Sequence, residues 1–166
     1  MSQHVPNRAV LPLRIAMEAR DTAAVVDAFA PGAVLRSPLT ARLTFTGHEQ
    51  IGALVQVLFE VLEDLRYTDE ACQGTTGFLA WRARIGDQHI QGVDLLQFGP
   101  DGRIEEFTVF FRPLPATALA LRLIGAGLVR HKSPARAAVV SSLARPLAFM
   151  TRVGDPIGVR LIRSAL

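Results

Sequence analysis

Apolar residues recur at helical spacing through the first third of the chain. Between residues 47 and 62 they fall three or four positions apart while glutamates lie off the apolar stripe, which predicts an amphipathic helix with one buried face. Two shorter helices are expected before it, over residues 12–20 and 21–29, the second with Asp21 as its N-cap and a stop at Pro31-Gly32. A brief strand over residues 34–37, ended by Pro38, leads toward the long helix.

Beyond residue 66 the hydrophobic period changes from helical to alternating. Glycine-containing turns separate four alternating runs, and compact turns of this kind join antiparallel neighbours in a sheet. Helices followed by a meandering antiparallel sheet predict an α+β fold. The four expected strands are residues 67–73, 78–85, 89–98 and 104–111.

The third of these strands carries an acidic residue on a face that is otherwise apolar. Asp94 is the only charge on its face, and an isolated charge in an apolar interior is costly. Two alternatives follow. The carboxyl is neutral, with a raised pKa, and donates a proton or hydrogen bond to a ligand; or it is a carboxylate paired with an arginine such as Arg36 or bonded to backbone amides.

Two prolines, Pro113 and Pro115, mark a change in the composition of the chain. Residues 1–116 hold ten arginines against fourteen acidic residues, whereas residues 117–166 hold seven arginines and one lysine against Asp155 alone. The sequence therefore predicts a first domain over residues 1–115 and a basic, apolar helical extension over residues 116–166.

The extension is expected to be an interrupted set of helices. One covers residues 116–129, a second begins at Ser133-Pro134 and is broken or kinked at Pro146, and a last short piece covers residues 157–166. Its leucines and valines supply too much apolar surface to stay in water. They either fold over the first domain or a partner copy, or lie on a membrane surface with the arginines facing anionic headgroups.

Length and composition narrow the class of protein. The chain has 166 residues, 49% hydrophobic and 20% charged, which suits one globular domain with an appendage and excludes a disordered chain. Cys72 is the only cysteine and the first residues lack an apolar signal segment, so a cytoplasmic protein is expected. No run approaches the roughly 18 apolar residues of a membrane span.

Recognisable metal, nucleotide and nucleic-acid patterns are missing from the sequence. The four histidines have no paired spacing, and no glycine-rich phosphate loop is present. The basic residues of the extension are scattered among leucines without aromatic stacking partners. We therefore expect no metal, no cofactor and no nucleic-acid partner.

Several short stretches carry a resemblance to a known family. They are residues 21–38, 45–51, 92–98 and 101–104, and with the order of elements they make residues 8–114 resemble the nuclear transport factor 2-like superfamily, which includes SnoaL-like cyclases and ketosteroid isomerase. The resemblance implies a curved antiparallel sheet that wraps the N-terminal helices into a cone, with a pocket at its wide end. It also implies a homodimer formed through the outer face of the sheet.

The resemblance also suggests roles for individual positions. Asp94 resembles the protonated, hydrogen-bond-donating aspartic acid of ketosteroid isomerases, whereas the general-base position is Ser37 and the tyrosine position is about Leu13. A serine without a partner base cannot remove a proton from carbon at neutral pH. Classical steroid isomerisation is therefore not expected of this chain.

Strand alternation and the resemblance place a group of apolar side chains on the same interior as Asp94. They form either an aromatic wall for a flat hydrophobic ligand or ordinary core packing. Ser37 is either a ligand contact or a turn serine before Pro38. Arg36 either neutralises an acidic ligand or Asp94, or is an exposed strand arginine. His48 is expected in the first turn of the long helix. The candidate wall residues are Trp81, Phe107, Val109 and Phe111.

The sequence thus predicts a protein that binds a small hydrophobic molecule. In the catalytic version, an isomerase- or cyclase-like reaction, Asp94 acts as an acid toward a carbonyl compound. The alternative is a non-enzymatic dimeric scaffold or membrane-surface module whose cone is filled by its own side chains.

Overall fold

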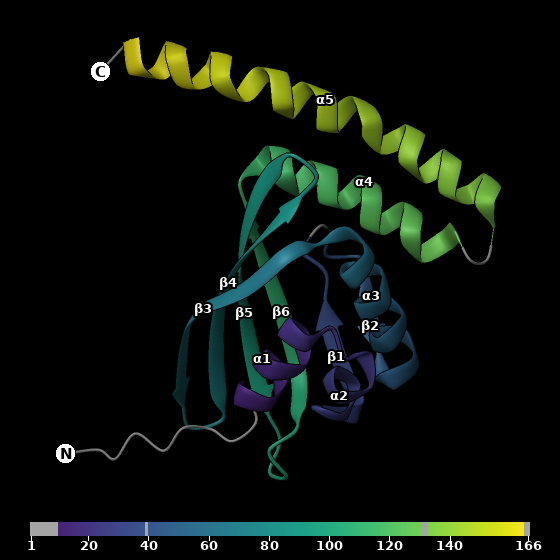
Figure 1. Cartoon of the computed structure of the whole chain (residues 1–166), viewed down its shortest axis with the longest axis vertical. Helices are drawn as coiled ribbons and strands as arrows, with labels where there is room; N and C mark the ends of the chain where they lie inside the picture. The colour runs from purple at the N-terminus through teal and green to yellow at the C-terminus, as the bar shows by residue number, and fades with distance from the viewer. Residues whose placement is uncertain (1–9, 39, 131–132, 165–166) are drawn as a thin grey trace. The chain divides into compact units, whose positions relative to one another are not determined.

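The computed structural model describes residues 10–38, 40–130 and 133–164 of the chain. The chain divides into two compact units, Met1–Phe111 and Arg112–Leu166. The first unit combines three helices with a six-stranded sheet, and the second is a pair of helices (Figure 1). The α+β fold class predicted from the sequence is confirmed.

The three helices of the first unit are α1 (Val10–Ala19), α2 (Thr22–Asp27) and α3 (Gly47–Val61). Asp21 caps α2 as expected, since its side chain accepts a hydrogen bond from the Ala24 N–H at 3.0 Å. The long helix α3 buries the apolar stripe that its spacing predicted, with Ile51, Leu54 and Val55 inside.

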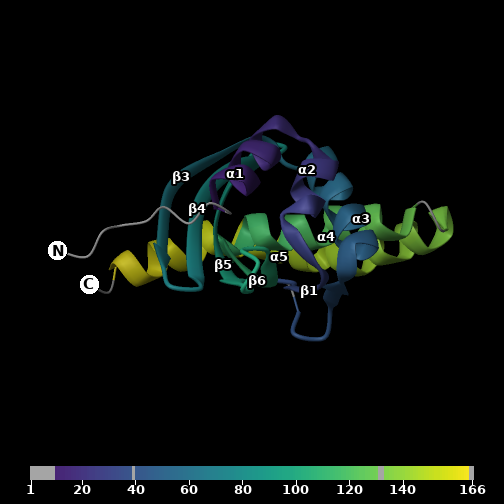
Figure 2. The same cartoon turned by 90° about the horizontal axis from the view of Figure 1, so that it is seen from below.

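The sheet has the strand order β2-β1-β6-β5-β4-β3 and curves strongly around α1 and α2 without closing (Figure 2). Successive strands from β3 to β6 are neighbours, as the alternating runs predicted. Curvature gives the sheet a concave side, toward which its inward-facing side chains converge. The strands are β1 (Phe29–Arg36), β2 (Thr44–Thr46), β3 (Glu63–Gln73), β4 (Thr76–Ile85), β5 (Gln88–Phe98) and β6 (Ile104–Arg112).

The first strand differs from its prediction. The expected helix over residues 21–29 ends at Asp27, and Phe29 already belongs to β1, which runs through Pro31 and Gly32. The pairing with β6 shifts register between Phe29 and Val34, and such an irregularity accommodates a proline, which cannot donate to the ladder.

The sheet is also mixed and not purely antiparallel, because β1 runs parallel to β6. After β1 the chain makes the short hairpin with β2, and α3 then carries it to β3 at the opposite edge of the sheet. The meander therefore returns to β1 only at its last strand. A pattern of local turns predicts neighbouring pairs well but contains no information on this closing partner.

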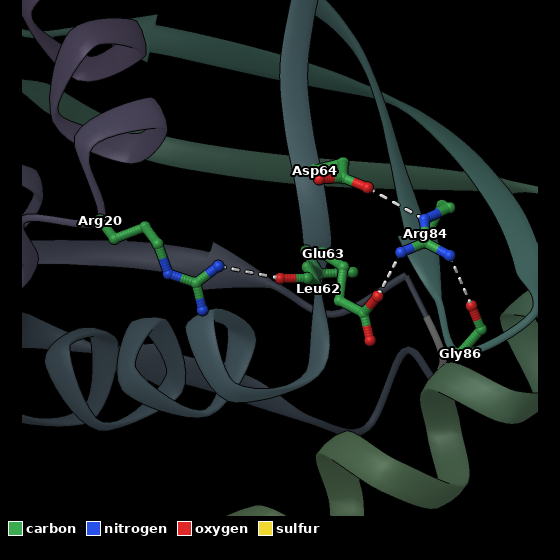
Figure 3. A network of polar contacts seen from close by, with 6 residues as sticks. All are labelled: Arg20, Leu62, Glu63, Asp64, Arg84 and Gly86. Atoms are coloured by element: carbon green, nitrogen blue, oxygen red, sulfur yellow. Dashed lines mark hydrogen bonds and ion pairs between the residues drawn. The ribbon is translucent and has the colours of Figure 1, made fainter.

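The junction between α3 and β3 is held by two arginines (Figure 3). Arg84 on β4 bonds Glu63 at 2.6 Å and Asp64 at 3.0 Å, both at the start of β3. The Arg20 guanidinium donates to the Leu62 carbonyl oxygen at 3.2 Å. These contacts explain why β3 begins at Glu63, four residues before the alternating pattern becomes clear.

The second unit consists of α4 (Leu114–Arg130) and α5 (Pro134–Ser164). The helix is not broken at Pro146, and the predicted separation before residue 157 is wrong, since α5 continues through both Pro146 and Pro156. Each proline removes only one intrahelical hydrogen bond, and both lie at exposed positions where water can bind the freed carbonyl. Among the helices described, none is long and apolar enough to cross a bilayer.

Candidate functional site

The candidate site is centred on Asp94, in the middle of β5. Its side chain is 3% exposed, and it is the only charged side chain buried among the described residues. Alternation along β5 turns Asp94 inward together with Ile90 and Leu96, which are fully buried. The fold thus places a carboxyl group in the apolar interior, as the strand pattern predicted.

Among the residues that the structure describes, the side-chain partner of the Asp94 carboxyl is the indole of Trp81 on β4. Trp81 Nε1–H donates to Asp94 Oδ1 at 3.0 Å. In the antiparallel pairing of β4 with β5, Leu79 lies opposite Asp94 and Trp81 lies opposite Gly92, so the bond runs diagonally between the strands. One oxygen of the carboxyl is therefore an acceptor, and Oδ2 is left to carry the proton of the neutral acid.

Gly92 makes room for this bond. A Cβ added at Gly92 would overlap the Trp81 indole and lie 2.9 Å from the Phe110 carbonyl oxygen. The ring consequently lies directly over the glycine, within reach of the carboxyl two residues along the same strand. The alternation along β5 does not by itself predict this role of Gly92.

Burial raises the pKa of Asp94 from 3.8 to about 7, because the ionised carboxylate loses its hydration; the hydrogen bond from Trp81, which favours the ionised form, opposes this effect. The predicted pairing with Arg36 is not present, since Arg36 bonds Glu106 at 2.8 Å on the exposed surface. Of the two alternatives drawn from the sequence, the structure favours the acid with a raised pKa.

Tyr67 on β3 is a further member of the site that the sequence analysis missed. It lies opposite Trp81 in the pairing of β3 with β4 and is 5% exposed. Burial raises its pKa well above the usual value of a phenol, and the negative charges of Asp94 and Glu18 raise it further. The alternation of Leu65 and Tyr67 as the inward-facing residues of β3 was the signal that could have identified it.

Two of the predicted wall residues meet at the site and two do not. The Phe111 ring contacts Trp81 edge-to-face, with the centroids 5.4 Å apart. Phe107 instead packs on Phe29, a core residue that is 2% exposed, with the centroids 5.5 Å apart. Val109 is half-buried on β6. Trp81 thus bonds the carboxyl and Phe111 packs against Trp81, whereas Phe107 has the contact of a core residue.

The remaining candidates lie elsewhere in the first unit. Ser37 follows the end of β1, where its N–H donates to the Leu43 carbonyl oxygen at 3.3 Å. His48 lies in the first turn of α3, as expected, with Nε2 2.9 Å from the Phe29 carbonyl oxygen. Leu13 is buried in α1. Within the described ranges, no three His, Cys, Asp or Glu side chains gather as a metal site would require.

A curved, unclosed six-stranded sheet combined with N-terminal helices defines the α+β class of the first unit. The chain belongs to the family of SnoaL-like domains, whose model matches residues 13–107. The match ends within β6, so it covers the helices, the sheet and Asp94 but neither α4 nor α5. The membership of the nuclear transport factor 2-like superfamily that the sequence suggested is confirmed.

Solved structures share this fold at low sequence identity. A steroid delta-isomerase from Pseudomonas aeruginosa is 24% identical with a TM-score of 0.66, covering 80% of this chain and 96% of its own. A bacterial protein with a cystatin-like fold from Silicibacter pomeroyi is 20% identical, with a TM-score of 0.69 and coverage of 81% and 92%. A candidate SnoaL-like polyketide cyclase from Shewanella denitrificans is 17% identical, with a TM-score of 0.53 and coverage of 63% and 88%.

A search of curated proteins finds no match to the chain. The structural likenesses lie below 25% identity and therefore establish the fold alone.

Proposed function

We propose that the protein binds a small hydrophobic carbonyl compound and that Asp94 serves as its acid in an isomerase- or cyclase-like reaction. The observation that carries the proposal is a lone interior carboxyl, 3% exposed, whose pKa is raised to about 7. Burying such a group costs stability, so its presence in the interior favours a functional role.

The chemistry follows from the two oxygens of Asp94. Because the Trp81 N–H occupies Oδ1, the proton of the neutral acid is placed on Oδ2. In this proposal, Oδ2 donates that proton to a ligand oxygen. A hydrogen bond from Oδ2 to a carbonyl oxygen polarises the C=O bond and stabilises the negative charge that develops on oxygen as an enolate forms. A pKa near the working pH also favours proton transfer in both directions.

The aromatic neighbours support an apolar, ring-containing ligand. The indole of Trp81 bonds the carboxyl and the Phe111 ring packs against that indole, and aromatic surfaces of this kind favour flat hydrophobic molecules. The names of two structural neighbours, a steroid delta-isomerase and a candidate polyketide cyclase, refer to compounds of this kind. Ser37 is not given the base role in this proposal, because a lone serine hydroxyl cannot remove a carbon-bound proton.

The proposal is tested by a thermal-shift screen of the full chain against hydrophobic cyclic ketones, phenols and fatty acids. A ligand at 100 times its Kd should stabilise the protein by about 2.7 kcal/mol. We expect ketones to stabilise the wild type and to lose most of this effect in Asp94→Ala. Ketone binding should also weaken as the pH rises above about 7, because the carboxyl then loses its proton.

The matched control is Asp69→Ala, which removes an exposed carboxyl from β3, two strands away from β5 in the sheet. It should leave every ligand shift unchanged. A ketone that stabilises Asp94→Ala as strongly as the wild type would overturn the role of Asp94. The absence of any stabilising compound would favour the non-enzymatic alternative, in which the cone is filled by its own side chains.

A further inference from the structure

The interior of the first unit holds a second oxygen donor that the proposed function does not use. It is the hydroxyl of Tyr67 on β3, whose side chain is 5% exposed. Burial and the negative charge of Asp94 both raise the pKa of Tyr67, so the hydroxyl keeps its proton and remains a donor. The resemblance to ketosteroid isomerases did not indicate this residue, because the tyrosine position of those enzymes falls at about Leu13 in α1.

The Tyr67 hydroxyl and Asp94 Oδ2 are both unpartnered within the described ranges. Tyr67 is bonded through its backbone N–H, which donates to Glu18 Oε1 at 2.9 Å, and Asp94 is bonded through Oδ1. Among the described residues, the polar side-chain atom that is both inaccessible and without a partner is Arg122 Nε. The Tyr67 hydroxyl and Asp94 Oδ2 therefore keep accessible surface, and the space they face can admit a small polar group.

The two donors are held apart by the strand between them. Tyr67 pairs with Trp81 across β3 and β4, and Trp81 pairs with Gly92 across β4 and β5. Asp94 is two residues further along β5, so its Cα atom lies about 10 Å from that of Tyr67 across the sheet and about 7 Å along it. The Trp81 indole, which lies over Gly92 and bonds Asp94 Oδ1, occupies the intervening strand. Two separate oxygens of one ligand match this spacing better than a single shared oxygen.

We propose that the site takes a cyclic ketone carrying a second oxygen elsewhere on its ring system, with Asp94 Oδ2 bonding the carbonyl oxygen and the Tyr67 hydroxyl bonding the second oxygen. This inference rests on the proposed function, because it assigns a second contact to the same ligand. A ketone without the second oxygen would leave the phenol hydroxyl unpaired in an apolar interior, which costs binding energy. Tyr67 would thereby select oxygenated ketones over plain ones, as sites built to bond a substrate oxygen do.

The test compares 1-tetralone, a bicyclic ketone, with its 5-, 6- and 7-hydroxy derivatives by isothermal titration calorimetry of the full chain. These compounds share one carbon skeleton and differ in the place of the second oxygen, so the series samples the separation of the two donors. We expect at least one hydroxytetralone to bind the wild type about fivefold more tightly than 1-tetralone, since one net hydrogen bond contributes about this factor.

Tyr67→Phe removes the hydroxyl and keeps the buried ring. It should weaken the binding of that hydroxytetralone about fivefold and leave the Kd of 1-tetralone unchanged. The matched control is Thr68→Val, which removes an exposed hydroxyl from the next residue of β3 and should change neither Kd. Thermal unfolding without ligand checks that both variants are folded.

The outcomes separate this inference from the proposed function. If Tyr67→Phe weakens 1-tetralone as much as the hydroxytetralone, both donors bond one oxygen and the inference is wrong. If no hydroxytetralone binds more tightly than 1-tetralone while Asp94→Ala abolishes ketone binding, the inference fails and the role of Asp94 stands. If no tetralone binds, the inference is overturned, and the thermal-shift screen against other ketones decides on the proposed function.

Discussion

At the scale of the residue, the candidate site depends on the carboxyl of Asp94, which keeps its proton to a higher pH than an exposed aspartate does. The pKa of Asp94 is about 7 in the folded protein because burial removes the hydration of its ionised form, whereas an unfolded aspartate titrates near 4. Between these values the native chain binds one more proton than the unfolded chain. Stability contributed by this group is therefore complete below about pH 4 and is lost as the pH rises to about 7.

The first prediction of the residue scale uses Asp94→Asn, which keeps an oxygen to accept the Trp81 N–H but cannot ionise. Between pH 4 and pH 8 the unfolding free energy of the wild type should fall by up to about 4 kcal/mol relative to that of this variant. The pKa shift is about three units, and each unit corresponds to about 1.4 kcal/mol. Urea unfolding of both proteins across this range measures the difference. A difference that stays constant with pH would contradict it.

Trp81 offers an independent readout of the same titration. It is the only tryptophan in the chain, and its Nε1–H bonds the titrating carboxyl. Its fluorescence should therefore change with a midpoint near pH 7 in the wild type and show no such transition in Asp94→Asn.

At the scale of the element, the site depends on how closely β4 and β5 approach around Gly92. The register places Trp81 opposite Gly92, and the glycine leaves the space in which the indole lies. A larger residue there must displace either the ring or the backbone carbonyl of Phe110, because a core at native density has no spare volume.

Gly92→Ala is accordingly expected to destabilise the protein by about 1–3 kcal/mol, as overpacked cores do. It should also shift the Trp81 fluorescence transition away from pH 7, since the displaced indole no longer bonds Asp94. Gly32→Ala is the control, because a Cβ at Gly32 meets nothing within 4 Å and the residue also lies in a strand. Equal stability of both variants would mean that the glycine does not position the indole.

At the scale of the whole molecule, the chain joins a SnoaL-like unit to a helical unit with different chemistry. The family match ends at residue 107, and Asp94, Trp81, Tyr67 and Phe111 all belong to the first unit. The net positive charge of the protein comes from the second unit, whose long helix α5 contains Asp155 as its single acidic residue. The two units therefore differ both in family membership and in net charge.

A chain truncated after Phe111 should retain the site. Because residues 1–111 contain the four site residues and all of the sheet except Arg112, we expect a folded protein by circular dichroism with the Trp81 transition still near pH 7. The full chain measured in parallel is the reference. An insoluble or unfolded product would show that the helical unit completes the core of the first one.

Much of this architecture was predictable from the sequence because it depends on local regularities. The helical spacing of α3, the Asp21 cap and the four alternating strands all appear in segments of 5–15 residues, and local propensity and burial agree in each. The inward orientation of Asp94 follows from the period of two along β5 and needs no knowledge of the strand's partners. The basic, apolar character of α5 is likewise a property of composition alone.

Other features were decided only by tertiary structure, because they depend on residues far apart in sequence. The parallel pairing of β1 with β6 and the continuation of β1 through Pro31 required the returning meander. The choice between a neutral and a paired Asp94 depended on where Arg36 and Trp81 lie, which strand alternation cannot specify. The sequence by itself determined that the side chain of Asp94 enters the interior. Only packing determined that Trp81, and not Arg36, bonds this carboxyl. Because burial without a positively charged partner raises its pKa, Asp94 keeps its proton up to about pH 7.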